Sequence, residues 1–231
     1  MVRVGAAFVA APVFSAVSVP LTVRVTLAGA IAVLAMNAMP IAAPTQIFAL
    51  ATFLSIAAEA LVGLAIGFVL QIAFAAPLVA SEVIGTSMGI GFANAINPQS
   101  GTSTPALGNF LSILLTLLFL SVDGHLILVE LVVRSYEILP PGAAWLGAGA
   151  LKNIAMFGGY AFLAGFLLLC LNLIVGMLSR SSPSLNLFAV GLPASLLVGV
   201  VALFIAMPAM GEYMLVIVDE ALNAARALVF G

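Results

Sequence analysis

The stretch from Ser81 to His125 reads SEVIGTSMGIGFANAINPQSGTSTPALGNFLSILLTLLFLSVDGH and stands out from the apolar sequence on both sides of it. Its first part is rich in glycine, which lets another backbone approach closely. A polar segment without charge follows from Asn94 to Pro105 and is rich in residues that favour turns. Apolar sequence resumes at Leu107 and ends at Asp123-Gly124-His125. A flexible, uncharged insert between two buried segments suits a constriction or plug, and suits a binding site for a charged substrate poorly.

The composition places the chain in a membrane. Hydrophobic residues make up 65% of the sequence and charged residues 6%, and the mean hydropathy is +1.35. A soluble domain has roughly a quarter of its residues charged. We therefore predict an all-α integral membrane protein.

Several classes of function lack the residues that they need. The net charge is −2, without a basic run, so nucleic-acid binding has no electrostatic basis. Cys170 is the one cysteine and His125 the one histidine, which excludes a disulfide framework and a multi-histidine metal site. No phosphate-binding loop of the GxxxxGK[ST] pattern occurs. With one charge at Arg3 and apolar sequence that simply continues, the N-terminus is interpreted as mature sequence rather than a signal peptide.

The apolar runs predict helices of unequal length. Val25–Met39 and Leu107–Val122 are short for a ~30 Å hydrocarbon core, whereas Ile47–Ala76 is long enough and is expected to break at Pro77. Ile154–Leu178 and Leu187–Met207 are expected to form a helical hairpin. Such a pattern is typical of helical hairpins packed against partner subunits, or of a bundle with re-entrant segments.

Two GxxxG patterns predict close helix packing, at Gly63 with Gly67 and at Gly85 with Gly89. Polar side chains within apolar sequence are candidate buried groups, because burying a charge is costly. They are Glu59, Glu82, Asp123, His125 and Arg180.

Two stretches near the C-terminal half are predicted to be amphipathic. Glu130, Arg134 and Glu137 share one helical face, which favours an exposed stripe with pairing within the helix. Met214–Phe230 mixes charged and apolar residues and suits a surface or partner-binding helix. The stretch Pro140–Gly149 between them is the best candidate linker.

Motifs in a fixed order carry a specific resemblance that spans about Arg3 to Met210. They are Pro20-Leu21-Thr22-Val23-Arg24, Glu59 to Phe68, Ser81 to Gly89, Asn97-Pro98, Leu118-Phe119-Leu120 with Asp123 to Leu126, Arg180 to Asn186, and Phe188 to Pro193. In these the chain resembles the FliR family of type III secretion export-gate subunits.

The resemblance implies a structural and gating subunit of the flagellar protein export channel, which conducts unfolded substrates. It implies FliP, FliQ and FlhB-like partner subunits and a place in the bacterial inner membrane at the flagellar basal body, partly out of the bilayer plane. It also implies a FliP-like part over residues 1–141 and a FliQ-like part over residues 142–231. No enzymatic activity and no cofactor are expected.

The family's plug loop maps onto the polar insert described above. The predicted plug or gating residues are Gly91, Phe92, Asn94, Asn97, Pro98, Gln99, Ser100, Gly101, Thr102, Ser103, Thr104 and Pro105.

Other functions stay open from the residues alone. An injectisome export gate would fit the same family. A small-molecule or proton-coupled transporter would use Glu59 and Glu82, although no internal repeat is evident. An intramembrane enzyme would need Asp123 and His125 as a catalytic pair, and a turn with a hydrogen-bonded histidine is the simpler interpretation.

Overall fold

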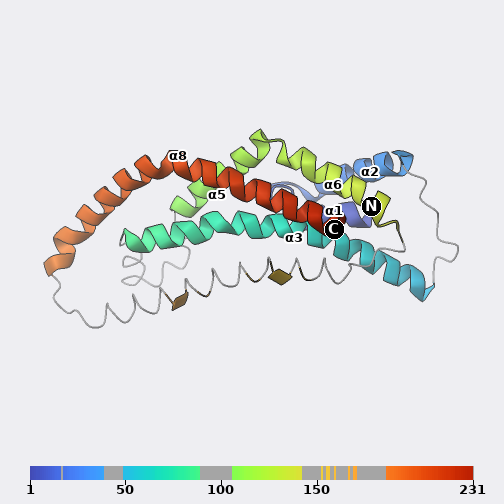
Figure 1. Cartoon of the computed structure of the whole chain (residues 1–231), viewed down its shortest axis with the longest axis horizontal. Helices are drawn as coiled ribbons and strands as arrows, with labels where there is room; N and C mark the ends of the chain where they lie inside the picture. Colours follow the sequence, from blue (N-terminus) through green and yellow to red (C-terminus); the bar gives the residue numbers. More distant parts are fainter. Residues whose placement is uncertain are drawn as a thin grey trace. The chain divides into compact units, whose positions relative to one another are not determined.

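The computed structural model describes most of the chain (Figure 1). Its described residues are 1–16, 18–38, 49–88, 106–141 and 186–230, with Lys152, Ala155, Met156, Gly159, Phe166, Leu169 and Cys170 between the last two ranges. These residues form helices and turns and contain no strand. The prediction of an all-α chain is confirmed.

Within the described ranges the chain forms six helices. They are α1 (Val2–Ala10), α2 (Leu21–Ala38), α3 (Leu50–Ser87), α5 (Ala106–Ser121), α6 (Gly124–Ile138) and α8 (Asn186–Phe230).

The chain divides into two compact units that are interleaved along the sequence. The first comprises residues 1–73, 119–158 and 216–231, and the second comprises residues 74–118 and 159–215. The first unit therefore holds α1, α2, most of α3, α6 and the end of α8. The second holds the end of α3, most of α5 and the rest of α8. The predicted boundary at residue 141 separates a FliP-like part from a FliQ-like part, which is a different division of the chain. It stays a prediction.

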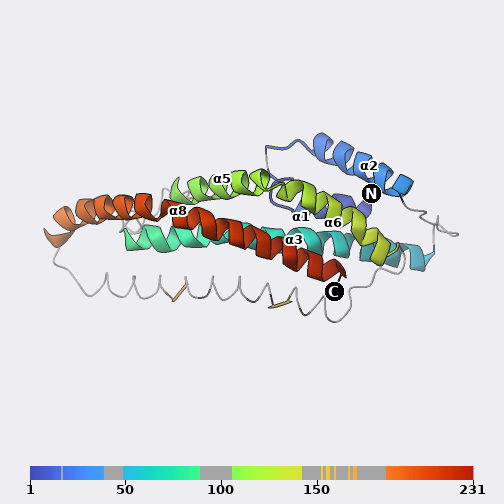
Figure 2. The same cartoon turned by 45° about the horizontal axis from the view of Figure 1, so that its top comes forward.

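In the first unit, α1 lies among α2, α3 and α6 (Figure 2). Its buried side chains include Val4, Ala7 and Phe8, at helical spacing. The helix ends before Pro12, and its C-cap Ala11 is extended with φ −76° and ψ 133°. Proline disfavours the helical region for the residue before it, so Pro12 explains this end. The ring of Phe8 then stacks on Phe14, with centroids 4.2 Å apart.

Prolines do not break the two longest helices. The expected break at Pro77 is wrong, because α3 continues through Pro77 to Ser87. The expected end at Met207 is wrong too, because α8 passes Pro208 and continues to Phe230. Proline removes one backbone hydrogen bond, but a broken helix in an apolar environment would leave several backbone groups without partners. Continuing the helix costs less.

The helices α5 and α6 are joined at a sharp bend of 63°. Asp123 lies in this bend in the left-handed region, with φ 56° and ψ 24°. Its neighbour Gly124 is pressed against Phe119, where a Cβ would overlap the ring. The predicted turn is therefore present.

Two helices of the described residues are long and apolar enough to cross a membrane, Leu50–Gly85 and Ala194–Phe230, and the bent pair α5–α6 counts as a third if it forms one span. This result and the composition make the chain an all-α membrane protein.

Two amphipathic predictions are confirmed. Arg134 pairs with Glu130 at 2.8 Å, and both side chains are more than half exposed. The end of α8 buries Val218, Leu222 and Ala225 while Asp219 remains exposed. It is the last part of one long helix, however, and not a helix of its own.

Candidate functional site

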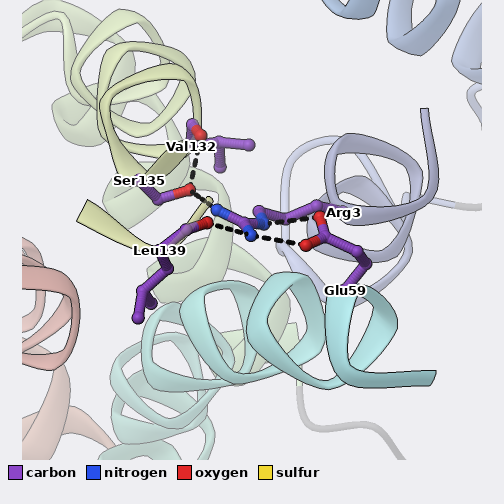
Figure 3. A network of polar contacts seen from close by, with 5 residues as sticks. All are labelled: Arg3, Glu59, Val132, Ser135 and Leu139. Atoms are coloured by element: carbon purple, nitrogen blue, oxygen red, sulfur yellow. Dashed lines mark hydrogen bonds and ion pairs between the residues drawn. The ribbon is translucent and has the colours of Figure 1, made fainter. Parts of the chain in front are cut away.

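Among the residues that the structure describes, the densest group of polar contacts lies in the first unit, around Arg3 of α1 (Figure 3). The Arg3 side chain is fully buried, and Glu59 of α3 is 8% exposed. Nε of Arg3 donates to Oε2 of Glu59 at 2.9 Å, and Nη2 donates to Oε1 at 2.7 Å. A two-pronged contact of this kind is the strong geometry for an arginine–carboxylate pair.

Two further contacts tie the same guanidinium to the end of α6. Nη1 of Arg3 donates to Oγ of Ser135 at 2.9 Å, and Nη2 donates to the carbonyl of Leu139 at 2.7 Å. Leu139 is the C-cap of α6, where the last carbonyls of a helix have no partner within the helix. Arg3 therefore neutralises a carboxylate on α3 and also caps α6.

The remaining groups around Arg3 are satisfied as well. Ser135 Oγ accepts from Arg3 and donates to the carbonyl of Val132 at 2.6 Å. The guanidinium carbon lies 4.2 Å from the ring centroid of Tyr136, a distance at which a cation is attracted to the ring face. We call Arg3, Glu59, Ser135, Tyr136 and the Leu139 carbonyl the Arg3 cluster.

Glycines let α1 approach α3 closely enough for these contacts. A Cβ on Gly63 would overlap the carbonyl oxygen of Arg3, and a Cβ on Gly67 would lie 2.6 Å from the carbonyl oxygen of Ala7. In both places the added carbon would come closer to the oxygen than a carbon–oxygen contact allows. The glycine pair that the sequence singled out thus faces the backbone of α1.

The other glycine pair has different surroundings. A Cβ on Gly85 would meet no described atom within 4 Å, so the described part of the chain makes no close approach there. Gly89 lies outside the described residues.

The remaining predicted polar residues do not join the Arg3 cluster. Glu82 is half-buried on the part of α3 that belongs to the second unit. Asp123 is exposed at the α5–α6 bend. The buried Nδ1 of His125 finds no hydrogen-bond partner among the described residues, and the expected hydrogen bond of this histidine stays a prediction. Arg180 and the predicted plug residues from Gly91 to Pro105 lie outside the described residues.

Arg3 is the residue that sequence reasoning missed. From the sequence alone, Arg3 is used only to interpret the N-terminus as mature sequence. A single charge at that position does not indicate whether the side chain is buried or paired. The available signal was Glu59, because a carboxylate within apolar sequence needs a cation, and the chain has few cations. Nothing in the sequence indicates which of these cations pairs with Glu59.

The Arg3 cluster suits a structural role. Its carboxylate is engaged by two N–H groups and is nearly inaccessible to solvent. Among the described residues, no three His, Cys, Asp or Glu side chains are grouped so that they could hold a metal ion.

Comparison with known proteins identifies the class. Residues 1–221 match the family described as bacterial export proteins, family 1. The chain belongs to this family.

The relatives are consistent in name. The flagellar biosynthetic protein FliR of Escherichia coli (strain K12) is 35% identical over 221 residues, which are 92% of this chain and 84% of that protein. FliR of Pectobacterium carotovorum is 36% identical, over 90% of this chain and 82% of that protein. FliR of Bacillus subtilis (strain 168) is 30% identical, over 89% and 83%. The resemblance to the FliR family is confirmed.

Proposed function

We propose that this chain is a structural and gating subunit of the flagellar type III export channel, which conducts unfolded flagellar substrates across the bacterial inner membrane at the basal body. The observation that carries the proposal is the similarity to flagellar FliR proteins along nearly the whole chain. The relatives reported above are all named as flagellar proteins, which favours a flagellar role over an injectisome.

The proposed gating element is the uncharged segment from Gly91 to Pro105. Its glycine, serine and threonine content favours a chain that a passing substrate can displace. It carries no formal charge, so it can lie in a pore without the desolvation cost of an ion.

The Arg3 cluster supports a structural role for Glu59 rather than a transport role. A carboxylate that carries protons or substrate must exchange them with water or a ligand. Glu59 is instead held by Arg3 in a buried pair. This observation weighs against a proton-coupled transporter that uses Glu59.

The exposed apolar surface supports partner subunits and lipid as neighbours. Large apolar side chains on α2, α3, α5 and α8 are exposed, among them Leu34, Phe53, Ile113 and Phe204. We propose that FliP-, FliQ- and FlhB-like subunits cover part of this surface. The proposed partners include no nucleic acid.

Deletion of residues 97–104 tests the gating proposal. The deleted segment has no apolar anchor, so the variant is expected to assemble with its partner subunits and to leak small ions. The measurement is ion flux across membranes that carry the assembled complex, with the wild-type complex as control. A complex that assembles normally and keeps the membrane tight contradicts the gating role.

A further inference from the structure

Two contacts in the second unit lie at the ends of the segment between Met88 and Ala106. We propose that Gly199 of α8 and Gly108 of α5 are positioning residues, which fix the places where this segment leaves α3 and enters α5. The inference rests on the gating function proposed above for the segment, and it concerns described residues on its two flanks.

The first contact holds Met88, at the end of α3, on α8. Met88 is 6% exposed, and its side chain fills the space over Gly199. A Cβ at Gly199 would lie 2.9 Å from Cε and 3.1 Å from Sδ of Met88. Any larger residue at position 199 must therefore displace Met88.

A hydrogen bond fixes the main chain of the same residue. Oγ of Ser195, one helical turn before Gly199, donates to the carbonyl of Met88 at 3.2 Å. Carbonyls at a helix end lack partners within the helix, so this bond satisfies a group that α3 itself does not satisfy. Both the side chain and the backbone of Met88 are thus held by α8.

The second contact holds the start of α5 on α3. A Cβ at Gly108 would lie 2.8 Å from Oγ and 3.5 Å from Cβ of Ser81, and 3.4 Å from Cδ2 of Leu78. Ser81 is 1% exposed, and its Oγ donates to the carbonyl of Leu78 at 2.7 Å. Rotating the Ser81 side chain away would break that bond, so the contact resists a larger residue at position 108.

Two other glycines of the second unit lack such contacts. A Cβ at Gly85 of α3 or at Gly211 of α8 would meet no described atom within 4 Å. The close contacts therefore belong to positions 108 and 199 in particular. Gly85 and Gly211 serve as matched controls.

The test measures how accessible the segment is to a thiol reagent, rather than the flux through the channel. In a Cys170→Ala background, Ser100→Cys provides a thiol for maleimide labelling in the assembled complex. Gly199→Val is expected to change the labelling rate by about fivefold or more, because overpacking shifts the positions of the groups that it displaces. Gly211→Val should leave the rate near that of the parent.

A reciprocal change in size separates positioning from general damage. Met88→Ala removes the atoms that a valine at 199 would meet, so adding Met88→Ala to Gly199→Val should return the labelling rate towards that of the parent. Met88→Ala alone should change the rate without adding bulk, which keeps the test available if Gly199→Val fails to assemble. Gly108→Val, compared with Gly85→Val, tests the other flank.

The outcomes separate this inference from the function on which it rests. Equal labelling rates in Gly199→Val and Gly211→Val, or no recovery with Met88→Ala, overturn the positioning role. If the 97–104 deletion does not leak while labelling still responds to Gly199→Val, the gating function is wrong and the positioning role stands.

Discussion

Arginine at position 3 donates a set of hydrogen bonds that lysine could not donate in the same geometry. Its planar guanidinium reaches both oxygens of Glu59 and, with the remaining N–H groups, Ser135 and the end of α6. A lysine ammonium is a single point of charge without this fork. The cluster therefore needs the shape of the guanidinium as well as its charge.

Removal of the carboxylate should destabilise the first unit. Glu59→Gln leaves the Arg3 charge buried without its counter-ion, and breaking a buried pair in this way typically costs about 3–5 kcal/mol. We expect a sharp drop in the thermal stability and recovery of the co-purified complex. Glu130→Gln is the matched control, because Glu130 belongs to an exposed pair worth roughly 0–1 kcal/mol.

The double change Arg3→Met with Glu59→Met tests the same idea from the other side. Replacing both members of a buried pair by apolar residues is often neutral or stabilising. The double variant should recover most of the stability that Glu59→Gln loses. A double variant as unstable as the single one would show that the cost arises from packing and not from charge.

Enlarging Gly63 should separate α1 from α3. A Cβ there would overlap the backbone of Arg3, which cannot rotate away as a side chain can. Overpacking of this kind typically costs about 1–3 kcal/mol. Gly63→Ala should therefore lower the melting temperature of the complex, whereas Gly5→Ala should not, because a Cβ at Gly5 meets no described atom within 4 Å. Equal melting temperatures would contradict the close contact.

At the scale of residues, the sequence indicates which residues are buried polar groups or packing glycines. It does not indicate which residues they contact. Glu59 is recognisable as a buried polar group because its neighbours are apolar. Its partner Arg3 is 56 residues away in the chain, and no local pattern encodes that distance. The glycines at 63 and 67 are recognisable by their spacing, but the spacing does not say which helix they face.

At the scale of helices, the bend at Asp123 links α5 to α6. Asp123 has a positive φ of 56°, a conformation that costs a residue with a side chain roughly 1–2 kcal/mol. The aspartate tolerates it better than a β-branched residue would.

Substitutions at Asp123 should therefore change stability in opposite directions. Asp123→Gly should be neutral or slightly stabilising, and Asp123→Ile should be destabilising, as measured by the melting temperature of the purified complex. Val122→Gly is the control, because Val122 does not have a positive φ and should gain nothing from glycine. A loss of stability in Asp123→Gly as large as that in Asp123→Ile would contradict the backbone argument.

Helix boundaries show where sequence rules fail in this chain. Pro12 ends α1 as the rule states, whereas Pro77 and Pro208 lie inside α3 and α8. The presence of a proline alone does not distinguish these cases. A local rule counts the bond that proline removes, but it does not count the unpaired backbone groups that a break would create in apolar surroundings.

At the scale of the whole molecule, the described residues expose many large apolar side chains. Phe204 is 79% exposed and Ile205 is 72% exposed, and both belong to a run of exposed apolar side chains on α8, a pattern that marks a surface covered by protein or lipid. We expect the chain expressed alone to aggregate or to be degraded, and co-expression with FliP- and FliQ-like subunits to stabilise it.

Size-exclusion chromatography in detergent and limited proteolysis measure this difference. The control is the same chain co-expressed with an unrelated membrane protein of similar size. A monodisperse, protease-resistant monomer obtained without partners would contradict the expectation.

Composition is enough to predict the class of molecule, because apolar content determines that the chain must avoid water. It does not predict the interleaving of the two units. That arrangement depends on contacts between residues far apart in the chain, such as the hydrogen bond between Ser195 and Met88. Periodicity within one segment contains no information about them.

The Arg3 cluster also has a consequence for how the chain is made. A ribosome synthesises Arg3 before both of its partners, since Glu59 follows 56 residues later and the Leu139 carbonyl 136 residues later. The Arg3 guanidinium therefore stays charged and lacks its full set of final partners until α6 has been synthesised. Because an unpaired guanidinium is costly in the hydrocarbon core, α1 should remain near the lipid headgroups or the insertion machinery until then. α1 is thus translated before α3 and α6 but reaches its final place only after them.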